Sequence, residues 1–86
     1  MMSAIAMFTI EKCLKKGGYT VKPEKQMSLH FAEIKEKFSV LFSSSVALVL
    51  ETSAGKVVVH RYGELLFQDS SDLSLIKKIA QEVYSL

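Results

Sequence analysis

The sequence predicts an α+β fold, in which helices pack on one face of an antiparallel sheet of about four to five strands arranged as a meander. Two observations support this prediction. First, four β-rich runs follow one another between residues 38 and 68, separated only by short turns. Gaps this short make neighbouring strands antiparallel, because a parallel crossover needs about a dozen residues or more. Second, an amphipathic helical pattern runs from Leu73 towards the C-terminus, so the strands precede the last helix.

The length of the chain is that of one small domain, which we expect to cover residues 1–86. Of these residues, 49% are hydrophobic and 23% are charged, close to the values of ordinary globular domains. A chain this short buries only about 60–65% of the surface that its unfolded form exposes, so a large internal active-site cavity is not expected. A single cysteine excludes an intrachain disulfide framework and favours a reducing, cytoplasmic location.

The only candidate targeting segment is Met1 to Ile10. It has no basic residue before its apolar stretch, so it does not have the pattern of a signal peptide. Its apolar run is also far shorter than the roughly 20 residues that span a bilayer, and no membrane association is expected.

The elements of the first part of the chain are harder to assign than those of the second. Apolar residues near helical spacing predict a helix over roughly residues 8–16, ended by Gly17-Gly18. Residues 3–8 fit either an extension of this helix or a short strand. Tyr19 to Val21 predicts a short strand that ends at Pro23. Residues 28–38 fit both periods, and we favour a helix from about residue 31 onward.

Turn residues define the elements of the second part. The four predicted strands are residues 38–42, 46–52, 57–62 and 64–68. Gly55 and Gly63 lie in the connections, where they can supply the positive φ that tight hairpins need. The following segment Asp69-Ser70-Ser71-Asp72 offers an N-cap for the last helix, with acidic groups at the positive end of its dipole.

The two faces of the predicted sheet differ in composition. One face is apolar and is expected to lie under the helices; it comprises Val46, Leu48, Leu50, Val57, Val59, Leu65 and Phe67, joined by Phe38, Val40 and Phe42. The other face is half apolar, which is more than a fully solvated sheet face should be. We expect this half-apolar face to be a binding surface. Its candidate residues are Val49, Val58, His60, Tyr62 and Leu66. In the simplest case, a symmetric partner subunit or the N-terminal segment covers this half-apolar face.

Residues that carry catalysis or bind metals do not form a known pattern in this chain. Cys13 occupies an apolar position of the first predicted helix, which favours a buried thiol over a nucleophile. His30 and His60 have no Cys, Asp or Glu at ligand spacing beside them, whereas a structural zinc usually needs four ligands. No Gly-rich phosphate-binding motif is present. We therefore expect no catalytic residues, no metal and no cofactor.

The segment from Val46 to Tyr84 resembles the end of one repeat of the TATA-box-binding protein family. Its later part, KVVVHRYGELLFQDSSDLSLIKKIAQEVY, contains an apolar strand, a two-residue turn closed by Gly, a second apolar strand, a short polar link and an amphipathic helix. The resemblance implies half of a TBP-like fold. The family has two such repeats in tandem and this chain has the length of one, so a complete saddle would require a homodimer.

The residues with which this family binds DNA do not carry over. His60 stands where the family has a Phe that wedges between base steps, and Ser43 stands where it has the partner Phe. Val49 replaces an Arg that meets the DNA backbone. Proteins that bend DNA through the minor groove need such apolar wedges and basic side chains. The resemblance therefore implies the fold without TATA-box binding.

Three functions from different classes are compatible with these observations. We favour a small non-catalytic interaction domain that forms a homodimer through the half-apolar face or a sheet edge. The second is a nucleic-acid-binding module, with candidate residues Lys35, Lys37, Lys56 and Arg61; a formal net charge of only +2 disfavours it. The third is a site for a small apolar ligand between the sheet face and the first helix, with His60 or Tyr62 supplying polarity.

Overall fold

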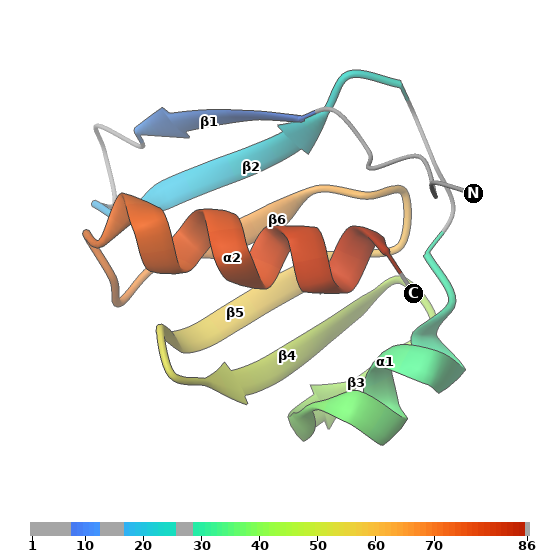
Figure 1. The fold of residues 1–86 in the computed structure, drawn as a ribbon. Coiled ribbons are helices and arrows are strands. Elements are labelled where there is room, and N and C mark those ends of the chain that lie inside the picture. Colours follow the sequence, from blue (N-terminus) through green and yellow to red (C-terminus); the bar gives the residue numbers. More distant parts are fainter. Residues whose placement is uncertain (1–7, 13–16, 26–28, 86) are drawn as a thin grey trace.

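A computed structural model describes residues 8–12, 17–25 and 29–85 and confirms the α+β class (Figure 1). The antiparallel sheet has six strands, not four to five, and its strand order is β1-β2-β6-β5-β4-β3. In chain order, the elements are β1 (Phe8–Lys12), β2 (Tyr19–Pro23), α1 (Phe31–Lys37), β3 (Ser39–Ser43), β4 (Ala47–Thr52), β5 (Gly55–His60), β6 (Leu65–Phe67) and α2 (Leu73–Tyr84).

Strands β3 to β6 form the predicted meander, in which each strand pairs with the next one along the chain. The glycines expected in its hairpins, Gly55 and Gly63, both have positive φ, at 84° and 118°. The far side of β6 pairs with β2, so that Val21 lies opposite Leu65. A hairpin of β1 and β2 therefore extends the meander at the β6 edge.

The helix expected over residues 8–16 is wrong for its first five residues, because Phe8–Lys12 is strand β1. This segment also has a period of two: Phe8 and Ile10 pack against the core, whereas Thr9 and Glu11 are exposed. Pairing with β2 gives the backbone its hydrogen-bond partners and selects the strand over the helix. Residues 3–7 and 13–16, including Cys13, lie outside the described residues.

Helix α1 confirms the helical assignment from residue 31 onward. It begins after His30, and the backbone N–H of Phe38 donates to the carbonyl of Ile34 at its end. Ile34 is fully buried, and the helix lies next to β3 to one side of α2 (Figure 1). This short helix therefore closes the core at the β3 end of the sheet.

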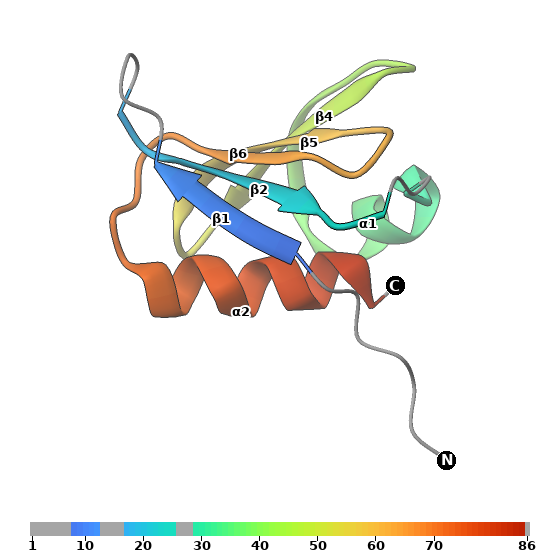
Figure 2. The same ribbon diagram turned by 90° about the horizontal axis from the view of Figure 1, so that it is seen from above.

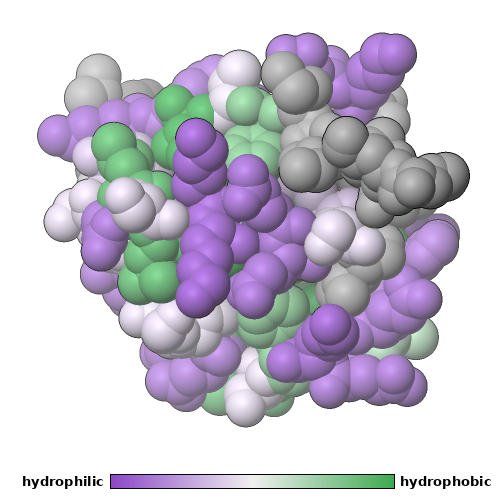
Figure 3. Space-filling model, in the orientation of Figure 1, coloured by the Kyte–Doolittle hydropathy of each residue, from purple (hydrophilic) through white to green (hydrophobic). Residues whose placement is uncertain are grey.

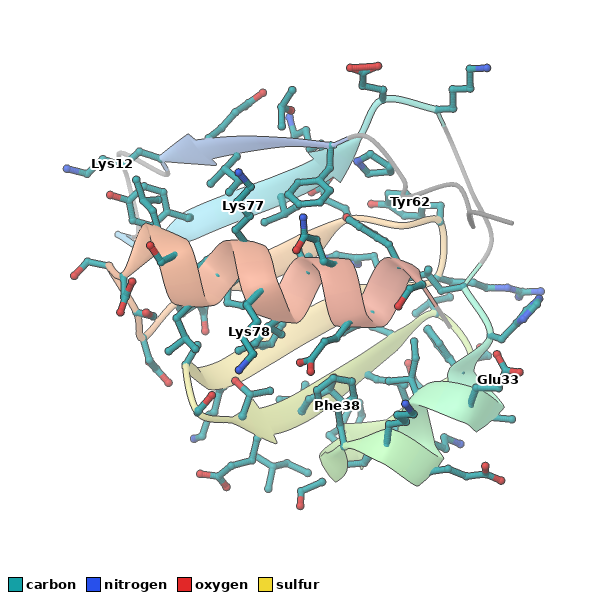
Figure 4. The ribbon with its side chains drawn as sticks, viewed as in Figure 1. Lys12, Glu33, Phe38, Tyr62, Lys77 and Lys78 are labelled. Carbon is teal, nitrogen blue, oxygen red and sulfur yellow. The ribbon has the colours of Figure 1, made fainter. Side chains whose placement is uncertain are left out.

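Helix α2 covers one face of the sheet (Figure 2). The side chain of Asp72 accepts a hydrogen bond of 3.2 Å from the backbone N–H of Leu75, which confirms the N-cap within the predicted segment. The buried residues of α2 are Ile76, Ile79, Ala80, Val83 and Tyr84. Lys77 and Lys78 are exposed on this helix (Figure 4), and the surface over its middle is hydrophilic (Figure 3). The helix is thus amphipathic, with its apolar side towards the sheet.

The predicted core face of the sheet is mostly confirmed. Six of its expected members are 0% exposed: Leu48, Leu50, Val57, Val59, Leu65 and Phe67. Phe38 and Val40 are partly buried and pack against this core. Phe42 and Val46 were wrongly assigned to this face, because they are 60% and 63% exposed. A β-bulge between Val40 and Phe42 places Phe42 opposite Val49, on the other face, and Val46 precedes the first residue of β4.

A buried hydrogen bond joins the end of α2 to the turn between β5 and β6. The hydroxyl of Tyr84 donates to the carbonyl of Gly63 at 2.6 Å, and the ring of Tyr84 lies 5.4 Å from that of Phe8, between centroids. Tyr84 is only 7% exposed. Its burial, together with the nearby charge of Glu64, raises the pKa of the Tyr84 hydroxyl well above its ordinary value.

Tyr84→Phe is expected to lower the free energy of unfolding by about 1–3 kcal/mol at neutral pH, because the Gly63 carbonyl loses its partner. The free energy of unfolding of this variant should also decrease less at high pH than that of the wild type. The folded state holds the Tyr84 proton to a higher pH than the unfolded state does, so this contribution is complete below about pH 10 and is lost as the pH rises further. Urea titrations at pH 8 and pH 10.5 would measure both effects. An equal decrease with pH in the two proteins would contradict the assignment.

Candidate interaction surface

The sheet face opposite α2 carries a continuous apolar row. Cross-strand pairing places Phe42 opposite Val49, Val49 opposite Val58, and Val58 opposite Leu66, so the row crosses four strands. It continues onto β2 and β1 as Thr20 and Glu11, where it becomes polar. We call this surface the open face, because no helix within the described residues covers it (Figure 2).

The most exposed apolar side chains of the described residues gather near this row. Leu41 is 49%, Phe42 60%, Val46 63% and Tyr62 50% exposed, and the remaining large one, Leu73, lies at the start of α2. Leu41 and Phe42 are on β3, and Val46 and Tyr62 flank the ends of β4 and β5. The apolar part of the open face is therefore the part formed by β3, β4, β5 and β6.

One corner of the open face is aromatic. The rings of His60 and Tyr62 are stacked, with centroids 5.6 Å apart and an interplanar angle of 22°. Together with Val46 and Arg61 they line an open hollow of about 390 Å³. Figure 4 shows Tyr62 at the end of the sheet where β5 and β6 are joined. This corner offers a flat aromatic surface with a guanidinium group beside it.

Tyr62 reaches this corner from a turn and not from a strand, so the strand predicted over residues 57–62 is too long. The backbone N–H of Gly63 donates to the carbonyl of His60 at 2.9 Å, and the N–H of His60 donates to the carbonyl of Glu64 at 2.8 Å. These two bonds close the hairpin around Arg61 and Tyr62. Gly63 takes the left-handed conformation that follows such a turn.

Two residues of opposite charge lie on the open face beside the apolar row. Glu51 on β4 is directly opposite Lys56 on β5, and both are exposed. Ser39 on β3 is opposite Glu51 on its other side. The face therefore has a polar row at one end, an apolar row in its middle, and Ala47 with His60 at the other end.

The structure brings the predicted binding residues together. Val49, Val58 and Leu66 are successive members of the apolar row. His60 is diagonal to Val49, because its direct partner is Ala47, and Tyr62 stacks on His60. Sequence reasoning missed Phe42 and Val46. The serines before β4 were the available signal for Val46: the Ser44 hydroxyl accepts from the N–H groups of Val46 and Ala47, which delays the start of the strand.

The four candidate nucleic-acid residues come from three separate parts of the fold. Lys35 and Lys37 lie in the last turn of α1, Lys56 is on β5, and Arg61 is in the turn after β5. Lys56 and Arg61 are at opposite ends of β5, about 16 Å apart along an extended strand. Glu51 lies directly opposite Lys56. These cations do not form one basic stripe.

The predicted ligand site between the sheet and an N-terminal helix lacks one of its walls. Residues 8–12, which were to supply that helix, form a strand of the same sheet. Of this predicted site, the described residues retain the open hollow beside His60 and Tyr62.

Within the described ranges, no three His, Cys, Asp or Glu side chains are grouped so that they could hold a metal ion. None of the described helices is long and apolar enough to cross a membrane. Comparison of the chain with protein-family models, with curated proteins and with solved structures gives no match.

Proposed function

We propose that this protein is a small, non-catalytic binding module that forms a homodimer through the open face, in the cytoplasm. The apolar row of Phe42, Val49, Val58 and Leu66 is the observation that carries the proposal. Large contiguous apolar patches are uncommon on monomeric soluble proteins and mark interaction surfaces. Covering this row removes apolar surface from water, with a gain of about 25 cal/mol for each Å².

The size of the molecule is compatible with such a dimer. A standard interface takes about 800 Å² from each partner. That is about one-seventh of the 5701 Å² of accessible surface, which one broad face of a two-layer molecule can supply. Dimers with two-fold symmetry are the commonest oligomers, and they need only one self-complementary patch.

Val49→Lys is expected to leave the fold intact and to abolish self-association. In the dimer, its ammonium group would be buried in the middle of the apolar row, at a cost of about 3 kcal/mol or more. Thr20→Lys is the matched control: it adds the same charge in the same row, but on β2, beyond the apolar part. Light scattering at two protein concentrations, with circular dichroism melting, measures both properties.

Three outcomes would contradict this proposal in different ways. A wild-type protein that is strictly monomeric at high micromolar concentration would remove the dimer. A folded Val49→Lys variant that is still dimeric would move the interface to an edge strand. Unfolding of the monomer by Val49→Lys would mean that the chain's own N-terminal segment covers the open face.

The alternative is a nucleic-acid-binding module of TBP-like fold without DNA-kinking residues. The stacked rings of His60 and Tyr62 with Arg61 beside them favour it, since aromatic side chains can stack on bases of single strands. Its sign would be binding of an oligonucleotide that weakens steeply as salt increases. A lack of binding to single- and double-stranded oligonucleotides at low salt would exclude it.

A further inference from the structure

We propose that the two copies of the dimer are related by a two-fold axis that runs parallel to the strands, between β4 and β5, so that β4 of each copy faces β5 of the other. This inference rests on the proposed function and specifies its partner as a second copy in one arrangement. It follows from how charge and apolar groups are distributed across the cross-strand pairs of the open face.

The charges of the open face differ in sign on β4 and β5, the two middle strands of its apolar part. Glu51 on β4 and Lys56 on β5 are direct cross-strand partners, and both are exposed. A rotation about an axis parallel to the strands exchanges β4 with β5 and keeps each position along the strand. Glu51 then faces Lys56 of the second copy, and Lys56 faces Glu51 of the second copy. Two opposite-charge contacts form from one pair of residues, as an isologous interface allows.

The same rotation matches the apolar row with itself. Val49 faces Val58 of the second copy, because these two residues are also direct partners. Phe42 on the outer strand β3 faces Leu66 of β6. Sheets that pack face to face are about 10 Å apart with their strands nearly aligned, so the long Glu and Lys side chains can meet across the gap.

A second symmetric arrangement that keeps the strands aligned uses an axis that runs along the apolar row, perpendicular to the strands. Each strand then faces its own copy and the ends of the sheet exchange. Glu51 would face Ala47 of the second copy and Lys56 would face His60 of the second copy. Glu51 would lose water without gaining an opposite charge, which is unfavourable. Of these two arrangements, the distribution of charge favours the axis between β4 and β5.

Two charge-reversal variants test the arrangement. The Glu51→Lys variant has lysine at positions 51 and 56, and the Lys56→Glu variant has glutamate at positions 51 and 56. Each variant alone should dimerise about tenfold or more weakly than wild type, because like charges face each other across the axis. An equimolar mixture of the two variants should form a heterodimer with a dissociation constant within about threefold of the wild-type value. Native mass spectrometry of the two chains, which differ in mass, identifies the heterodimer, and analytical ultracentrifugation gives the affinities.

The mixture separates contacts within a chain from contacts between chains. Each variant has like charges opposite one another within its own sheet, in the pure and in the mixed sample alike. Only a contact between chains can therefore restore dimerisation on mixing. The double variant Glu51→Lys/Lys56→Glu exchanges the two charges and should dimerise as wild type does.

The results that overturn this arrangement differ from those that overturn the proposed function. If wild type dimerises and each single variant dimerises equally well, the axis is wrong and the homodimer stands. If the single variants lose dimerisation but their mixture does not recover it, the charges do not face each other and the axis is again wrong. If wild type is monomeric at high micromolar concentration, the proposed function itself fails.

Discussion

Leu48→Ala is expected to lower the free energy of unfolding by about 2–4 kcal/mol, because it removes a fully buried side chain and leaves a cavity under α2. Val49→Ala, one residue further along the same strand, is the matched control. Val49 is half-buried on the open face, so its truncation should cost about 1 kcal/mol or less in the monomer. Urea denaturation at a protein concentration low enough for the monomer to dominate gives both values. If Leu48→Ala unfolds like wild type, the two faces of the sheet are interchanged.

Gly18→Ala is expected to destabilise the protein by about 3–4 kcal/mol, through two effects that add. Gly18 has a φ of +76°, which an L-residue adopts only with strain. A Cβ at this position would also lie 2.8 Å from the Cα of Gln68 and against the carbonyl oxygen of Phe67. These are backbone atoms at the end of β6, and moving them would disturb the pairing of Tyr19 with Phe67.

Gly17→Ala separates these two effects. Gly17 has nearly the same φ, +75°, but no atom of the described residues lies within 4 Å of a Cβ built there. Its substitution should therefore cost only the conformational strain, about 1–2 kcal/mol. Thermal melting of the two variants in parallel makes the comparison. Equal melting temperatures would show that β2 and β6 are not in close contact at this point.

The sequence predicted the meander and α2 well because both depend on local signals. Short turns with glycine separate β4, β5 and β6. The apolar residues from Leu73 onward recur at the spacing of a helix and do not alternate as in a strand. The parity of Val49, Val58 and Leu66 relative to those turns was enough to predict which side chains share the open face. A local pattern with one consistent solution was therefore sufficient for most of the candidate site.

The sequence did not predict the first strand or the full extent of the apolar row, because each depends on contacts between distant residues. Phe8 to Lys12 fits a helix and a strand equally well, and its pairing with β2 decides between them. Phe42 moves to the open face because Leu41 is an additional residue in β3, and nothing in the serine-rich segment that follows reports such a bulge. Tyr62 was expected on a strand, but the hydrogen bonds around Gly63 end the strand at His60.

The strand order has a consequence for the path by which the chain folds. Contacts among β3, β4, β5 and β6 join segments that are close in sequence, so this hairpin series can form early. The pairing of Val21 with Leu65 instead closes a loop that contains α1 and strands β3 to β5. The conformational entropy of this loop is lost before the contacts between β2 and β6 stabilise the fold. We therefore expect β1 and β2 to dock last during folding and to open first from the native state. The backbone amides of β1 should exchange with solvent deuterium sooner than those of β4 and β5.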